Sequence, residues 1–130
     1  MICINIIEVN PIVLAYLGDT VYEYYVRRHL IDSGIGNVND LQKNAVNFVS
    51  AVNQAKYLSC LFEKDFFTDE EMDIIRRARN HKGVGHPKNC DVVTYKHATS
   101  LEALIGYLKL KGNDNRIEEI MNLILGGSLC

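Results

Sequence analysis

The sequence has no long apolar run and no basic amino-terminal leader. No apolar stretch approaches the roughly 18 residues that a membrane-spanning helix requires. The first residues, MICINIIEVNP, carry Glu8 and Asn10 early and lack the basic region of a secretory signal. The sequence therefore predicts a cytoplasmic protein without a membrane anchor.

The chain also has no excess of one charge. It carries 14 Lys and Arg residues against 16 Asp and Glu residues, for a formal net charge of -2. The overall charge therefore does not indicate a nucleic-acid-binding protein, and any site for a polyanion must come from a local cluster. With 130 residues, 48% hydrophobic and 23% charged, the composition is typical of one folded domain.

Cysteine pairs of the CxxC type are missing as well. The four cysteines are spread along the chain at Cys3, Cys60, Cys90 and Cys130. This distribution fits neither a zinc ribbon nor a small disulfide-rich scaffold, so we expect isolated thiols. A metal cluster could be drawn from His81, His86, Cys90 and His97. Its spacing fits no common zinc pattern, and an ordinary polar loop is the favoured interpretation.

No segment shows the sustained alternation of a half-buried strand, whereas helical spacing and capping signals recur. We expect an all-α domain of about six or seven helices. They are predicted from Pro11 to about Ile31, after a cap at Asn37 or Asn39, after Ser50 with Ala51, Ala55, Leu58 and Phe62 on one face, from Asp69 to about Asn80, from Asp91 to Lys111, and from Asn113 or Asp114 to Gly126. Residues 81–89 are predicted to form a loop.

Two carboxylates interrupt apolar helical segments. Asp19 follows Gly18 in the first helix, and Glu102 lies between Leu101 and Leu104 in the fifth, one turn before Gly106. Packing of the two helices at Gly18 and Gly106 would bring the carboxylates together, and a hard divalent cation with oxygen ligands would relieve their repulsion. An equally weighted interpretation is that each carboxylate reaches solvent or an arginine at the domain edge.

Glu23, one turn after Asp19, is a weaker candidate for the same cation. It stands four residues before Arg27, the spacing of an ion pair along one helix face. A solvated face or that ion pair is favoured over metal binding.

Residues 76–97 form a basic segment with a local formal charge of about +5, whereas residues 63–73 form an acidic stretch. A solvated surface loop is one interpretation of the basic segment. Its position beside the Glu102 helix favours contact with a phosphate backbone.

Several ordered motifs resemble one family over nearly the whole chain. They are NPIVLAYLGD at residues 10–19, RRARN at 76–80, PKNCD at 87–91 with Thr94 and Tyr95, and LEALIGY at 101–107. These motifs resemble the catalytic domain of the ribonuclease III family, and more closely its short branch, Mini-ribonuclease III. We therefore expect one ribonuclease III catalytic domain over residues 1–130, without a double-stranded-RNA-binding domain.

The resemblance implies a homodimeric endoribonuclease that cuts double-stranded RNA with Mg2+, for which Mn2+ can substitute. It implies a role in maturation of the 23S ribosomal RNA precursor and hence in ribosome biogenesis, with a ribosomal protein as a further candidate partner. Carried over by position, Asp19 and Glu102 are the catalytic metal ligands. The larger enzymes have further carboxylates where Ala15 and Thr99 stand here. A second cation would therefore need ligands from the RNA phosphate, water or Glu23.

Duplex RNA hides its base edges in a deep major groove, so recognition should depend on shape, phosphates and 2′-hydroxyls. The residues predicted to contact RNA are Arg79, Asn80, Lys82, Lys88, Asn89, Lys96 and His97. A non-catalytic helical RNA-binding or ribosome-assembly module is the alternative function, supported by the missing carboxylates at Ala15 and Thr99. A helical DNA-binding regulator is more distant, because the chain has no recognition-helix pattern.

Overall fold

A computed structural model describes residues 5–82 and 87–130, and over these ranges every regular element is a helix. The elements are a short 3-10 helix η1 (Ile6–Glu8) and the α-helices α1 (Pro11–Asp32), α2 (Val38–Val49), α3 (Ala51–Glu63), α4 (Asp69–Arg79), α5 (Val92–Lys111) and α6 (Asp114–Leu125). The predicted all-α fold is confirmed. None of the described helices is long and apolar enough to cross a membrane.

Helix ends follow the local capping chemistry of the sequence. The Asn10 side chain accepts a hydrogen bond from the Ile12 amide at 2.8 Å, with Pro11 opening α1. Asn37, and not Asn39, caps α2. Thr68 forms the predicted capping box with the third residue of α4, and Gly112 ends α5 in a left-handed conformation with φ +79°.

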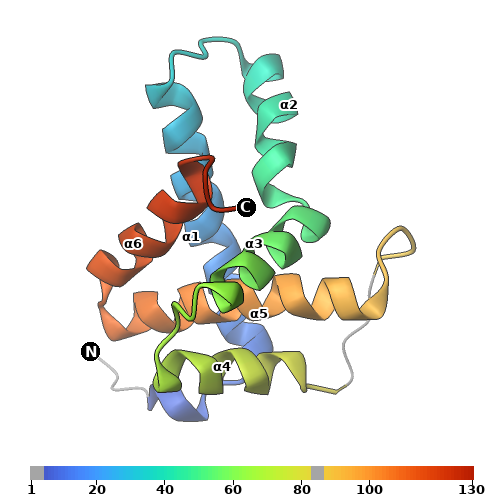
Figure 1. Cartoon of the computed structure of the whole chain (residues 1–130), viewed down its shortest axis with the longest axis vertical. Coiled ribbons are helices and arrows are strands. Elements are labelled where there is room, and N and C mark those ends of the chain that lie inside the picture. Colours follow the sequence, from blue (N-terminus) through green and yellow to red (C-terminus); the bar gives the residue numbers. More distant parts are fainter. Residues whose placement is uncertain (1–4, 83–86) are drawn as a thin grey trace.

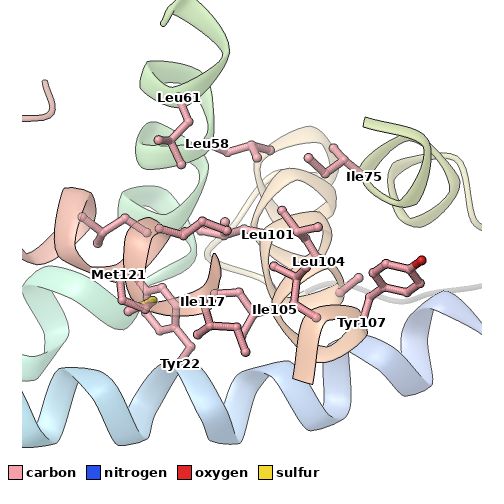
Figure 2. Close-up of a cluster of buried hydrophobic side chains, with 14 of the residues drawn as sticks. Tyr22, Leu58, Leu61, Ile75, Leu101, Leu104, Ile105, Tyr107, Ile117 and Met121 are labelled. Atoms are coloured by element: carbon pink, nitrogen blue, oxygen red, sulfur yellow. The ribbon is translucent and has the colours of Figure 1, made fainter. Parts of the chain in front are cut away.

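Helix α5 is the central element of the domain. It packs against α1, α3, α4 and α6, and it runs across α1 in Figure 1. From residue 98 to residue 108 every position of α5 is buried except Glu102. Figure 2 shows the resulting core, in which Leu101, Leu104 and Ile105 of α5 lie among side chains from the surrounding helices. Glu102 is thus the one residue between positions 98 and 108 of α5 whose side chain is only partly buried.

The buried face of α3 differs from the predicted face. The helical spacing placed Ala51, Ala55, Leu58 and Phe62 on one face. Leu58 is buried at 1% exposure, but its buried partners on α3 are Gln54 and Leu61. Ala51, Ala55 and Phe62 are only partly buried, and Phe62 packs against the core from its edge.

The prediction of isolated thiols was wrong for two of the four cysteines. Cys60 of α3 and Cys130 form a disulfide, although 70 residues separate them. The chain after α6 turns back at Gly127 (φ +80°) and buries Leu129, which places Cys130 beside α3. Linear spacing could not reveal this pair because the fold brings the cysteines together. Cys3 lies outside the described residues.

A buried ion pair joins α6 to the start of α4. Nε and Nη2 of Arg116 donate to the two carboxylate oxygens of Glu71, each at 2.8 Å, and Nη2 also donates to the Phe66 carbonyl at 2.9 Å. The side chains of Arg116 and Glu71 are only 16% and 5% exposed. Burial raises the pKa of Glu71, but hydrogen bonds from Arg116 and Thr68 outweigh burial and lower that pKa below its ordinary value.

We expect Arg116→Met to lower the free energy of unfolding by about 3 to 5 kcal/mol at pH 7, because it leaves the Glu71 carboxylate buried without its partner. Since the folded-state pKa of Glu71 is lowered, the pair stabilises the fold fully above the ordinary carboxyl pKa and loses this effect as pH falls through the lowered value. The difference between variant and wild type should therefore shrink in acid. Urea denaturation at neutral and acid pH measures both quantities.

The control is Arg27→Met, which breaks the ion pair with Glu23 at 3.2 Å on exposed α1 surface. Its side chain is 72% exposed, so the change should stay within about 0.5 kcal/mol. Equal losses for the two arginine variants would contradict the importance of the buried pair.

Candidate active site

The site begins with a close crossing of α1 and α5 at two glycines. A Cβ atom on Gly18 would lie 1.7 Å from the backbone oxygen of Glu102, and one on Gly106 would lie 1.9 Å from the backbone oxygen of Leu14. Only residues without a side chain permit the two backbones to approach so closely. Asp19 and Glu102 are next to this contact, so the crossing determines where both carboxylates lie.

The structure brings Asp19 and Glu102 together. The Asp19 side chain lies beside that of Glu102, with Asp19 on the exposed surface of α1 and Glu102 half-buried in α5. Burial, together with the neighbouring carboxyl group of Asp19, raises the pKa of Glu102 to about 9. A cation beside the two carboxylates would offset this repulsion.

Two further side chains act on Glu102. The negative charge of Glu23 also raises the Glu102 pKa, whereas the neighbouring Gln54 amide of α3 lowers it. Sequence reasoning missed Gln54, although its spacing of four residues from Leu58 and seven from Leu61 places a polar residue on an apolar helix face. Glu23 forms the ion pair with Arg27 that its spacing indicated.

The donor set fits a hard divalent cation. Asp19 and Glu102 offer oxygen atoms only, which are the ligands that Mg2+ prefers, and their mutual repulsion favours a positive charge between them. No group of three or more His, Cys, Asp or Glu side chains that could hold a metal is found in residues 5–82 and 87–130. Glu23 therefore does not complete a three-carboxylate cluster with Asp19 and Glu102. A cation here would take its other ligands from water or substrate.

A metal cluster of His81, His86, Cys90 and His97 was the less favoured interpretation of the loop before α5. Among the described residues His81, Cys90 and His97 form no metal-binding group, and Cys90 lies in the turn before α5. His86 lies outside the described residues.

The predicted RNA-contacting residues gather at one end of the α4–α5 pair. In Figure 1 the end of α4 and the beginning of α5 lie on the same side of the molecule. Arg79 ends α4 and Asn80 caps it, Lys88 and Asn89 precede α5, and all are exposed. Lys82 is also exposed, whereas Lys96 and His97 in α5 are partly buried. This group of residues is called the basic end below.

The basic end is separate from the carboxylate pair but near it. Lys96 precedes Glu102 by six residues of one helix, a rise of roughly 9 Å. The structure thus brings Asp19 and Glu102 into contact and leaves the basic end beside them. A ligand touching both would have to be extended and anionic, as a nucleic-acid backbone is.

An apolar groove lies elsewhere on the molecule. It has a volume of about 420 Å3 and runs between α1 and α2, with Glu23 and Arg27 at its edge and apolar side chains such as Ile31 along it. A duplex is far too large for such a groove, and the Asp19 carboxylate is instead open to solvent at the surface of α1.

Comparison with known proteins gives one consistent family. The family model described as "Ribonuclease III domain" matches residues 12–113. The chain is 42% identical to Mini-ribonuclease 3 of Staphylococcus aureus over 116 residues, covering 89% of this chain and 87% of that protein. It is 41% identical to Mini-ribonuclease 3 of Streptococcus pneumoniae, covering 94% of each. A crystal structure of a protein from Fusobacterium nucleatum superposes with a TM-score of 0.82 at 31% identity, covering 92% of this chain and 94% of that chain.

Proposed function

The chain belongs to the ribonuclease III family, in its Mini-ribonuclease III branch, and on this premise we propose that it hydrolyses double-stranded RNA with a divalent cation held by Asp19 and Glu102. The family is one of endoribonucleases. The observation that carries the proposal is the carboxylate pair at the α1–α5 crossing, whose repulsion a cation would relieve. Mg2+ is the expected cation, with Mn2+ as a substitute.

The residues around the site have separate roles in this proposal. Asp19 offers its carboxylate at the surface, where a phosphodiester can approach. Glu102 offers the second carboxylate from α5. The burial of this helix limits the movement of Glu102. Asp19 and Glu102 would hold the cation, which would supply an activated water for in-line attack on phosphorus and would shield the charge that develops on the phosphate oxygens. No side chain of the chain has to act as a nucleophile.

The basic end positions the substrate in this proposal. Its exposed arginine and lysine side chains offer positive charge beside the carboxylate pair, which itself repels phosphate when no cation is bound. Asn80, Asn89 and His97 add hydrogen-bonding groups for phosphates or 2′-hydroxyls. Recognition of this kind follows the shape of the duplex rather than its base sequence.

We expect removal of charge from the basic end to flatten the salt dependence of RNA binding. If Arg79, Lys82 and Lys88 contact phosphates, each Ala substitution should lower the slope of log affinity against log salt by about 0.7 to 1. Binding should weaken alike for duplexes of every sequence, while turnover at saturating RNA changes less. Titration of duplex RNA in Ca2+, from low to moderate salt, measures the slopes.

Lys64→Ala is the matched control, because Lys64 is exposed in the acidic stretch of residues 63–73. Its slope should equal that of the wild type. An unchanged slope in the triple variant of Arg79, Lys82 and Lys88 would mean that the RNA lies elsewhere, with Arg27 and Arg28 of α1 as the next candidates.

We also propose that the active form is a homodimer. Cutting both strands of a duplex requires two sites that face opposite strands, which a two-fold dimer supplies. Helix α1 carries apolar side chains on its outer surface, including Tyr16 at 83% exposure and Val13 and Tyr24 at about half. These residues would be covered by a second copy.

The biological setting that we propose is the cytoplasm, with the 23S ribosomal RNA precursor as substrate during ribosome biogenesis and a ribosomal protein as a further partner. The alternative is a non-catalytic RNA-binding or ribosome-assembly module, favoured by Ala15 and Thr99 at two carboxylate positions of the larger enzymes. Metal-dependent cleavage of duplex RNA by the purified protein separates the two functions.

A further inference from the structure

Gln54 is a polar residue on the apolar face of α3. Its side chain is 3% exposed, and it stands in a row with Leu58 and Leu61, which are exposed by 1% and 0%. An aliphatic residue would fill such a position without any polar group to satisfy. A buried amide therefore indicates a specific partner.

That partner is Glu102. The Gln54 amide lies beside the Glu102 carboxyl group, where α3 packs on α5. Glu102 thus has neighbours from two helices, Asp19 on α1 and Gln54 on α3. Helix α3 packs directly on α5, so this contact is part of the helix interface itself.

The orientation of the Glu102 carboxylate matters because the proposed cation site has only two carboxylates, those of Asp19 and Glu102. Glu102 has three rotatable side-chain bonds, and no third acidic, His or Cys side chain joins the pair in the described part of the chain. A neutral amide restricts these rotations without adding a negative charge to a site that already has two. Groups that orient metal ligands in this way commonly affect metal affinity as much as activity.

We propose that Gln54 is a positioning residue, which holds the Glu102 carboxylate toward Asp19 so that both offer oxygen atoms to one cation. The inference rests on the proposed function of the Asp19–Glu102 pair. It assigns to α3 a direct role in the site that the carboxylates alone do not reveal.

The test is Gln54→Met, which keeps the length of the side chain and removes the amide. Mn2+ binding to the RNA-free protein, followed by the electron paramagnetic resonance signal of free Mn2+, should show a Kd raised about 10-fold or more. The Mg2+ concentration for half-maximal cleavage should rise in parallel, and excess Mn2+ should restore turnover. Duplex affinity in Ca2+ should be unchanged. Leu58→Met, one turn along the same buried face, is the control and should match the wild type in Mn2+ affinity.

A second variant covers the case in which Gln54→Met does not fold. Gln54→Asn keeps an amide but withdraws it by one methylene, and the same weakening of Mn2+ binding is expected. Wild-type Mn2+ affinity in either folded variant overturns the inference, as does lost activity with unchanged Mn2+ affinity. The proposed function fails separately, if the wild type binds no Mn2+ or if Asp19→Asn leaves Mn2+ binding intact.

Discussion

Asp19→Asn and Glu102→Gln should each reduce cleavage of duplex RNA by roughly a thousandfold or more. The amide has the shape of the carboxylate but lacks the charge that would hold a divalent cation. Because Asp19 and Glu102 are the two members of one contact, loss of either leaves a single carboxylate at the α1–α5 crossing. Single-turnover cleavage of a labelled duplex in Mg2+ measures the rates.

Two controls distinguish loss of chemistry from loss of structure. Each variant should keep the wild-type circular dichroism spectrum and should bind duplex RNA in Ca2+ nearly as well as the wild type. Glu23→Gln should reduce the rate less than tenfold, since Glu23 is paired with Arg27 at 3.2 Å. Substantial turnover in both the Asp19 and Glu102 variants would remove the assignment of the site.

Gly106→Ala should be strongly destabilising, lowering the free energy of unfolding by about 3 kcal/mol or more. Its Cβ would lie 1.9 Å from the Leu14 backbone oxygen, which cannot rotate away as the end of a side chain can. The two helices would have to separate along their contact. Urea denaturation measures the stability, and cleavage by the folded fraction should also be lost because Asp19 and Glu102 move apart with the helices.

Gly36→Ala is the control for this prediction. A Cβ at Gly36 meets nothing within 4 Å, and its φ is not in the left-handed region, so the substitution should be neutral or slightly stabilising. Gly18→Ala should resemble Gly106→Ala, since its Cβ would lie 1.7 Å from the Glu102 backbone oxygen. A stable and active Gly106→Ala protein would contradict the close crossing.

Much of the fold could be predicted because its signals are local. The caps at Asn10 and Ser50, the box of Thr68 with Glu71, and the stop at Gly112 each depend on residues within four positions of one another. The α1–α5 contact is not local, yet it was predictable, because small residues and carboxylates occur together in two apolar helices. That pattern predicted the proximity of Asp19 and Glu102 as one of two equally weighted interpretations.

Features that depend on tertiary placement could not be predicted in the same way. Cys60 and Cys130 meet only because the chain after α6 folds back on α3. Gln54 faces inward because α3 lies on α5 along a line that its own sequence does not specify, and the alternative line through Ala55 and Phe62 had similar spacing. The partner of a buried polar residue on one helix is on another, so helical periodicity alone did not identify it.

The most direct test of the site is cleavage of a labelled duplex RNA, compared with each of its single strands, by the purified wild-type protein in EDTA and in increasing Mg2+. We expect the duplex to be cut only when Mg2+ is present, the single strands to remain intact, and Asp19→Asn to be inactive throughout. Tight binding of the duplex without cleavage in Mg2+ or Mn2+, or cleavage that persists in EDTA, would contradict hydrolysis by a cation at Asp19 and Glu102.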